Sequence, residues 1–275
     1  MTKAKFTVVI PSYNRAEFIE QAIESVLEQT YDKWKLLIID DASTDDTVKK
    51  VEPYLKDERI RLVCLDRNQG ISSVLNRALE EVDTEAFVQL DSDDWLDSDA
   101  LRRFSKAMKE DPSAALYYGN VRMWAQRSSG KWKVIKRVRH RKFDNKYQFL
   151  CYMTYMLHPR CYRTEAVREV GGWETDDPYG GRIMEDRRMV LKLIERYPLH
   201  WINKTLYNRR KHRLQLTKKE DFQMRNQLRK ELVSRSLSNW GNEYSPVFGY
   251  RGGLLIVKRL LHRKKSKMIQ VREAQ

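Results

Sequence analysis

The first 120 residues alternate regularly between short apolar runs and longer stretches whose apolar residues recur at helical spacing. The apolar runs are rich in Val, Ile and Leu and occupy residues 6–10, 36–39, 60–65 and 86–90. Between them, helical spacing marks residues 16–29, 45–55 and 71–82. Continuous apolar strands separated by amphipathic helices predict an α/β fold, in which a mostly parallel, Rossmann-like sheet is flanked by helices.

The chain is long enough to bury a full core. Its 275 residues are 41% hydrophobic and 11% aromatic, which suits one large domain or a domain with an extension. No stretch approaches the roughly 18 consecutive apolar residues of a membrane span, and the first residues lack a signal-peptide pattern. We therefore expect a cytoplasmic protein.

The net charge of +15 conceals an asymmetry along the chain. Residues 1–100 hold 12 Lys and Arg against 22 Asp and Glu, whereas the remaining residues hold 41 against 16. A basic surface of this kind can bind nucleic acid, an anionic membrane or an anionic substrate, and charge alone does not choose among them. About half of these charges are expected only to keep the surface solvated.

Polar motifs follow the four predicted strands, at the edge where parallel α/β sheets bind ligands. They are residues 11–15 (PSYNR), 40–43 (DDAS), 67–70 (RNQG) and 91–94 (DSDD). The last motif crowds three carboxylates, and a divalent cation would offset their repulsion while presenting positive charge to a phosphate. The alternative is that these acids cap a helix beginning near Ser98.

The order and spacing of these four motifs resemble the family 2 glycosyltransferases of the GT-A fold, over nearly all of the first 120 residues. The resemblance implies that Asp41 hydrogen-bonds the nucleotide base, whereas Asp40 has a structural role. It also implies that Asp93 is a metal ligand and that Asp91 contacts the ribose or the water shell of the metal. Tyr13 would line the base or stack on it. The remaining nucleotide-binding positions would be Pro11, Asn14, Asn68 and Gly70.

The chemistry of phosphate transfer agrees with this resemblance. A nucleotide sugar loses a diphosphate whose departure builds negative charge, and a metal held by Asp93 would stabilise that leaving group. Mn²⁺ or Mg²⁺ suits a carboxylate site. The sequence has no G-x-x-x-x-G-K-S/T loop and no G-x-G-x-x-G motif after its first predicted strand. Arg side chains and the metal are therefore expected to replace those phosphate cradles.

Two motifs in the second half resemble the acceptor side of the same family. Gly172 and Trp173 match a glycine turn and acceptor loop in which Trp offers a sugar a stacking face; a simple turn with a core Trp is the alternative. Glu185 and Asp186 match a Glu-Asp motif whose Asp is the catalytic base, so Asp186 is the candidate for deprotonating the acceptor. Charge compensation at a helix start is the other interpretation. The two arginines that follow depart from the family pattern and hint at an anionic acceptor.

Residues 206–212 (LYNRRKH) resemble the Arg-x-His segment of the family. By this resemblance, Arg210 neutralises the diphosphate and His212 completes the metal shell. Taken alone, such a segment is more often a solvated basic loop. Leu75 stands where many relatives have Arg, so one phosphate or ribose contact is expected to be missing.

We divide the chain into a GT-A domain over residues 1–215 and a helical, basic C-terminal extension over residues 216–275. Within the domain, residues 1–120 form the nucleotide-binding half and residues 121–215 the acceptor half. The extension ends in a basic amphipathic segment that could lie on an anionic membrane or pack against the catalytic domain. No membrane helix or Gln-x-x-Arg-Trp motif follows the catalytic motifs, which argues against a processive synthase.

These features predict an inverting, non-processive glycosyltransferase that needs Mn²⁺ or Mg²⁺. It would move a sugar from a UDP- or dTDP-sugar to a hydroxyl acceptor in the synthesis of a surface polysaccharide or glycoconjugate. A sugar nucleotidyltransferase is the alternative enzyme, although it should carry a Gly-rich, basic loop after its first strand. A nucleic-acid-binding protein is the alternative from another class, and it would not need Asp93. We expect no nucleic-acid partner.

Overall fold

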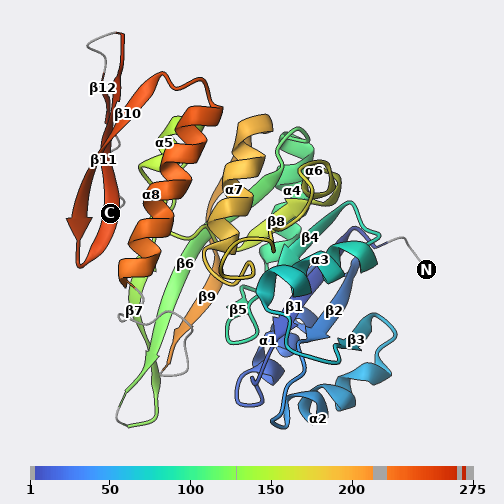
Figure 1. Cartoon of the computed structure of the whole chain (residues 1–275). Helices are drawn as coiled ribbons and strands as arrows, with labels where there is room; N and C mark the ends of the chain where they lie inside the picture. The colour runs from blue at the N-terminus through green and yellow to red at the C-terminus, as the bar shows by residue number, and fades with distance from the viewer. Residues whose placement is uncertain (1–3, 128, 213–221, 265–267, 271–275) are drawn as a thin grey trace.

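The computed structural model describes residues 4–127, 129–212, 222–264 and 268–270. Within these ranges the chain forms a nine-stranded sheet with helices on both faces and a separate three-stranded sheet near the C-terminus (Figure 1). The large sheet has the strand order β3-β2-β1-β4-β8-β6-β9-β5, and β7 pairs with β6.

The four strands predicted in the first half form the parallel part of the large sheet. They are β1 (Phe6–Ser12), β2 (Trp34–Asp40), β3 (Ile60–Cys64) and β4 (Ala86–Gln89). β1 pairs in parallel with β2 and β4, and β2 pairs in parallel with β3. Since parallel strands share a direction, all four end at one edge of the sheet. The predicted parallel sheet is confirmed, and the polar motifs after its strands meet at that edge.

Later strands extend this sheet. They are β5 (Trp95–Leu96), β6 (Leu116–Gln126), β7 (Trp132–Val138), β8 (Arg160–Arg163) and β9 (Leu199–Lys211). β8 is antiparallel to both β4 and β6, so β6 runs in the same direction as β4, and β9 is parallel to β6. Strands β5, β7 and β8 run the other way. The sheet is therefore mostly parallel, as predicted.

Helices cover both faces because each buries one apolar side. They are α1 (Ile19–Leu27), α2 (Thr47–Val51) with the 3₁₀ turn η1 (Glu52–Lys56), α3 (Ile71–Glu81), α4 (Ala100–Glu110), α5 (Lys146–Leu150), α6 (Thr164–Glu169) and α7 (Glu185–Arg196). Val8 and Ile10 of β1 share one core with α1 and α4, whereas Val9 shares another with α3 and α7. This alternation along β1 follows the period of two of a strand.

The C-terminal part needs a correction. The predicted helix exists as α8 (Phe222–Asn239), but it is followed by the strands β10 (Tyr244–Arg251), β11 (Leu254–His262) and β12 (Met268–Gln270). Gly252 and Gly253 have φ of 55° and 83° and form the turn between β10 and β11, as expected for a two-residue hairpin loop. Residues 216–221, 265–267 and 271–275 of the predicted extension lie outside the described residues.

Helix α8 is not a detached extension. Its Leu228, Leu232 and Leu237 lie in the same buried apolar cluster as Leu193 of α7. The C-terminal helix therefore shares a core with α7 and the sheet. No helix in the described ranges is long and apolar enough to cross a membrane.

Candidate active site

The loops after β1, β2 and β3 are tied together by short side chains. The backbone N–H of Asn14 donates to Ser43 Oγ at 2.8 Å, and Asn14 Oδ1 accepts from the backbone N–H of Thr44 at 2.8 Å. Asn14 has φ of 51°, a conformation that Asn tolerates better than most residues. Asn14 therefore fixes the loop after β1 against the loop after β2, which indicates a structural contribution to the predicted nucleotide site.

The two neighbouring acids after β2 have different partners. Asp40 accepts from the backbone N–H and the hydroxyl of Ser43 at 2.7 and 2.5 Å, and so closes its own loop. Asp41 accepts from the backbone N–H groups of Gln69 and Gly70 at 2.7 and 2.8 Å. Asp41 thus holds the loop after β3 in place, and each of its oxygens keeps one further lone pair for a ligand.

The loop after β1 carries side chains that suit a planar, charged ligand. The Tyr13 side chain is 41% exposed directly after β1. Arg15 donates to the carbonyls of Tyr13 and Asn14, and its Nε lies 3.7 Å from Asp93 Oδ2. Pro11 is buried at the end of β1, where it supports the turn. An exposed ring beside a fixed arginine is the arrangement expected for a base next to a phosphate.

The carboxylate cluster after β4 meets the end of β9. His212 Nε2 lies 2.9 Å from Asp93 Oδ2, and the His212 ring packs against Phe18 with ring centroids 4.4 Å apart. Asp94 is buried and accepts from the backbone N–H of Arg210 at 2.7 Å. Burial and repulsion from Asp93 and Asp91 raise the pKa of Asp94 well above its usual value. The direction of this shift shows that the carboxylates of the cluster repel one another.

These residues fit a divalent cation that also binds phosphate. Among the described residues, no three His, Cys, Asp or Glu side chains converge as metal ligands. Asp93 and His212 supply two adjacent donors, one carboxylate and one imidazole. Mg²⁺ is commonly held by one or two protein groups and completed by substrate phosphates and water. Such an ion would relieve the carboxylate crowding around Asp94.

The role predicted for Arg210 needs a correction. Its side chain is only 4% exposed and donates to Gln21, and the guanidinium stacks on Phe18, Trp95 and Trp132 at 4.7, 5.2 and 5.1 Å from the ring centroids. A cation enclosed by aromatic rings is not presented to a diphosphate. Arg210 instead anchors the strand end that carries His212.

Arg160 connects the carboxylate cluster after β4 to the start of α7, and the sequence analysis missed it. Its guanidinium is buried, donates to Asp91 Oδ1 at 2.6 Å, and lies 3.9 Å from Asp186 Oδ2. Burial opposes the ionisation of Asp91, but Arg160 and His158 hold its pKa below the usual value. The available signal was a charged residue opening the β8 strand in the middle of the sheet.

Asp186 and Glu185 begin α7 but have different surroundings. Asp186 is 3% exposed, and Arg187 Nη1 donates to its Oδ1 at 3.1 Å. Burial favours its neutral form, yet Arg187 and Arg160 keep the pKa of Asp186 below its usual value. Glu185 is half-buried, and burial together with the Asp186 charge raises its pKa to about 7. Near neutral pH, Asp186 is thus held as a carboxylate.

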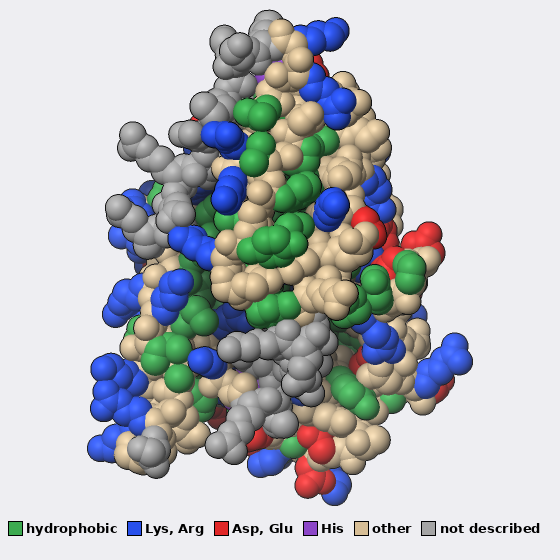
Figure 2. All heavy atoms as spheres, turned by 60° about the vertical axis from the view of Figure 1, so that its left-hand side comes forward, with side chains coloured by type: hydrophobic (Ala, Val, Ile, Leu, Met, Phe, Trp, Pro, Cys, Tyr) green, Lys and Arg blue, Asp and Glu red, His purple; other side chains and the backbone are tan. Residues whose placement is uncertain are grey.

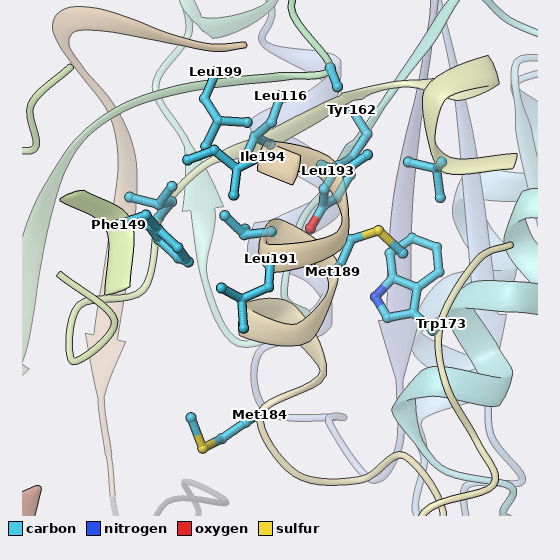
Figure 3. Close-up of a cluster of buried hydrophobic side chains, with 14 of the residues drawn as sticks. Leu116, Phe149, Tyr162, Trp173, Met184, Met189, Leu191, Leu193, Ile194 and Leu199 are labelled. Atoms are coloured by element: carbon cyan, nitrogen blue, oxygen red, sulfur yellow. The ribbon is translucent and has the colours of Figure 1, made fainter. Parts of the chain in front are cut away.

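The prediction that Trp173 offers a stacking face to a sugar is wrong. Trp173 is 4% exposed and packs in the core against Phe87 and Tyr162, and Figure 3 shows its ring beside Met189. Gly172 has φ of 63°, and a Cβ there would meet Asn76 Oδ1 at 2.5 Å. The glycine turn therefore serves to bring the backbone close to α3, where Asn76 bonds both backbone groups of Trp173.

The arginines that follow Asp186 are also engaged within the protein. Arg187 Nε donates to the carbonyl of Met153 at 2.7 Å, and Arg188 pairs with Asp177. Because both side chains are paired within the protein, these two arginines do not indicate an anionic acceptor.

Arg182 is exposed and donates to Asn68 Oδ1 at 2.7 Å. It brings a cation to the nucleotide-side loop, close to Gly70.

Comparison with known proteins identifies the family. The model named "Glycosyl transferase family 2" matches residues 7–171. Chondroitin synthase of Escherichia coli is 31% identical over 253 residues, which cover 88% of this chain and 34% of that protein. The E. coli UDP-Glc:alpha-D-GlcNAc-diphosphoundecaprenol beta-1,3-glucosyltransferase WfgD is 33% identical over 138 residues, which cover 50% of this chain and 53% of that protein.

A solved structure shows the same fold. S. aureus TarS 1–349 in complex with UDP-GlcNAc superposes with a TM-score of 0.63 at 19% identity, covering 86% of this chain and 67% of that one. This likeness confirms the predicted GT-A fold. The chain spans about half or less of the curated relatives that it matches first. Since the family model covers more than half of the sequence, the chain belongs to glycosyl transferase family 2.

Proposed function

We propose that this protein is an inverting glycosyltransferase that transfers a sugar from a nucleoside-diphosphate sugar to an acceptor hydroxyl. One observation carries the proposal. The buried Arg160 spans Asp91 on the donor side and Asp186 on the acceptor side, and Asp91 stands two residues before Asp93, which pairs with His212. A candidate cation-binding pair and an ionised candidate base are thereby connected near the carboxyl ends of the parallel strands.

On the donor side, Asp41 and Tyr13 would hold the base, and Asn68 and Gly70 would shape the ribose and phosphate region. Arg182 would supply a positive charge there, in place of the arginine that Leu75 replaces. Asp93 and His212 would hold Mn²⁺ or Mg²⁺, which when bound would stabilise the departing diphosphate as a Lewis acid. Asp91, fixed by Arg160, would contact the ribose or the water around the ion.

On the acceptor side, Asp186 would take the proton of the acceptor hydroxyl. The acceptor oxygen then forms a bond to the anomeric carbon while the bond from that carbon to the diphosphate oxygen breaks, which inverts the configuration. The nucleoside diphosphate leaves with the electron pair. Arg187 and Arg160 keep Asp186 ionised before the reaction, and Glu185 lies at the rim of the same helix start.

The substrates follow from the same site and from the relatives. UDP- and dTDP-sugars are the proposed donors, since UDP-GlcNAc is bound in TarS. WfgD is named for transfer to a diphosphoundecaprenol-linked sugar, and we propose a lipid-linked saccharide acceptor in polysaccharide or glycoconjugate synthesis here. The protein would then work at the surface of a membrane. Both alternatives from the sequence, a nucleotidyltransferase and a nucleic-acid-binding protein, receive no support from the family match.

A donor panel tests the proposal. The protein is incubated with UDP-, dTDP-, GDP- and CMP-sugars with Mn²⁺ or with EDTA, and release of the free nucleotide is measured. We expect slow hydrolysis of one UDP- or dTDP-sugar that needs the metal. Hydrolysis of none of them, together with no stabilisation of the protein by UDP and Mn²⁺, would refute the proposed function.

A further inference from the structure

The three-stranded C-terminal sheet has one face on the protein and one face outward. Leu255, Val257 and Leu260 are at most 5% exposed, and the last two share a core with α8. A bulge shifts the register between Val257 and Arg259, so side chains on both sides of it stay inside. The outward cross-strand pairs are Ser245 with Leu261, Val247 with Arg259, Gly249 with Ile256, and Arg251 with Leu254.

We call these outward residues, together with Lys258, the hairpin face. Val247, Leu254 and Ile256 are half-buried, and Leu261 is 39% exposed. A Cβ added at Gly249 would meet the alkyl chain of Lys258, which therefore lies across this face. Exposed basic residues surround the apolar patch: Arg251, Lys258, Arg259, Arg263 and Lys264.

Acidic residues are missing from this part of the sequence. No Asp or Glu occurs from Tyr244 to Lys264. Figure 2 views the side of the molecule that carries the C-terminal sheet, and it shows a stripe of hydrophobic side chains with Lys and Arg around it. The Asp and Glu side chains in that view gather mainly near its right and lower edges. The face is therefore both apolar and uniformly cationic.

One end of the hairpin face lies near the segment that contacts the start of α7, where Asp186 is placed. Arg251 Nη1 lies 3.5 Å from the hydroxyl of Tyr155, next to the 153–154 segment whose carbonyls accept from Arg187. Arg187 in turn holds Asp186. The tip of the hairpin thus contacts the segment that positions the proposed base.

We propose that the hairpin face docks the protein on an anionic lipid bilayer, an inference that rests on the lipid-linked acceptor of the proposed function. Lys and Arg are attracted by lipid phosphates, and apolar side chains between them enter the headgroup region. A second copy of this chain is a poorer occupant, because two identical faces without acids would repel each other. Nucleic acid has no need for the apolar stripe at the centre.

Vesicle binding by the full chain tests this docking. Co-sedimentation is measured with vesicles of phosphatidylcholine alone and with vesicles that contain about one third phosphatidylglycerol. We expect binding only to the anionic vesicles, weakened by salt. The triple variant Lys258→Glu/Arg259→Glu/Lys264→Glu should lower the partition coefficient roughly 100-fold, because three favourable charges become unfavourable.

A matched variant separates the face from net charge. Lys33→Glu/Lys56→Glu/Lys109→Glu makes the same change in charge at exposed positions of the N-terminal half, and its partition coefficient should stay within about threefold of the parent. Far-UV circular dichroism checks the fold of both variants. If the first does not fold, the milder Lys258→Gln/Arg259→Gln/Lys264→Gln replaces it and should still lose about tenfold or more.

Three results would overturn the inference: equal binding to neutral vesicles, equal losses in the two triple variants, or a dimer that the hairpin variant alone dissociates. Donor hydrolysis measured without vesicles keeps the two proposals apart. Hydrolysis with no vesicle binding refutes the docking alone, whereas vesicle binding without any donor chemistry refutes the proposed function and leaves the docking in place.

Discussion

The acids after β2 on the proposed donor side and Asp186 on the proposed acceptor side are held by different means. Asp40 accepts from the backbone N–H of Ser43 in its own loop, and Asp41 accepts from two backbone N–H groups of the loop after β3. On the acceptor side, Asp186 is buried and is held by the guanidinium groups of Arg187 and Arg160. The first arrangement uses neutral donors fixed by the backbone, and the second uses full charges removed from water.

This difference predicts how much stability is lost when a partner of each carboxylate is removed. Losing a neutral hydrogen bond costs little unless a buried group is left unpaired. Losing one partner of a buried ion pair leaves an uncompensated charge, which costs several times more. Single changes at Asp40 or Asp41 should therefore lower the free energy of unfolding less than removal of a buried cation beside Asp186 does.

The largest effect is expected for Arg160→Met. The change leaves Asp91 and Asp186 facing each other without their shared cation, and it should lower the free energy of unfolding by about 3–5 kcal/mol. Urea unfolding followed by circular dichroism measures it. The control is Arg61→Met, which breaks the exposed pair with Glu81 and should cost less than about 1 kcal/mol. Equal losses of stability in the two variants would mean that the buried pairs of Arg160 stabilise the fold no more than an exposed ion pair does.

Asp186→Asn should lower the rate of transfer roughly 100-fold or more, the usual scale for a lost general base. Its affinity for the donor and metal should stay near that of the parent, since Asp186 contacts neither Asp93 nor His212 in the described contacts. Glu185→Gln is the companion variant and should keep most of the activity. If Glu185→Gln is inactive and Asp186→Asn is not, the base is the neighbouring residue.

The paired acids after β2 sharpen the comparison within the donor side. Asp40→Ala and Asp41→Ala should each lower the free energy of unfolding by about 1–3 kcal/mol, since both leave buried N–H groups unpaired. Only Asp41→Ala should weaken the binding of uridine nucleotides further, because only Asp41 is proposed to meet the base. Titration of both variants with UDP decides it, and equal affinities would reject the assignment of Asp41.

The smallest effect is a pH dependence at the helix start of the acceptor side. Burial and the neighbouring Asp186 raise the pKa of Glu185 from 4.5 to about 7. The folded state thus binds this proton more tightly than the unfolded state, so the stability from protonated Glu185 is present below pH 4.5 and is lost as pH rises through 7.

The amide of a Glu185→Gln variant would mimic the protonated carboxyl group. This variant should therefore melt a few degrees above the parent near pH 8 and at the same temperature as the parent near pH 4.5. Thermal melting across this range measures the difference. A difference in melting temperature between the variant and the parent that is the same at every pH would mean that Glu185 does not titrate between pH 4.5 and 8.

The donor side could be predicted from the sequence because its signals are local. Strands of apolar residues ended at polar motifs, and the parallel topology alone brought those motifs to one edge. The pairing of Asp93 with His212 across 119 residues was inferred through the family resemblance rather than through spacing.

The acceptor side and the C-terminus were harder because their contacts are long-range. A charged residue at the start of a central strand marks Arg160 as unusual, but the sequence does not reveal that it bridges two carboxylates or that Arg210 lies among aromatic rings. Trp173 shared a motif with an acceptor loop, but packing against Phe87 decided its place. For the hairpin β10–β11 a local signal does exist: two glycines between two apolar runs indicate a tight turn, although the amphipathic basic composition favours a helix.

The central claim is that Asp93 and His212 bind the donor through a divalent cation. Calorimetric titration of UDP into the parent and into Asp93→Asn, with Mn²⁺ or with EDTA, tests it most directly. The parent should bind UDP at least about tenfold more tightly with Mn²⁺, and Asp93→Asn should show one weak affinity under both conditions. An Asp93→Asn variant that keeps the full gain from Mn²⁺ would contradict the claim.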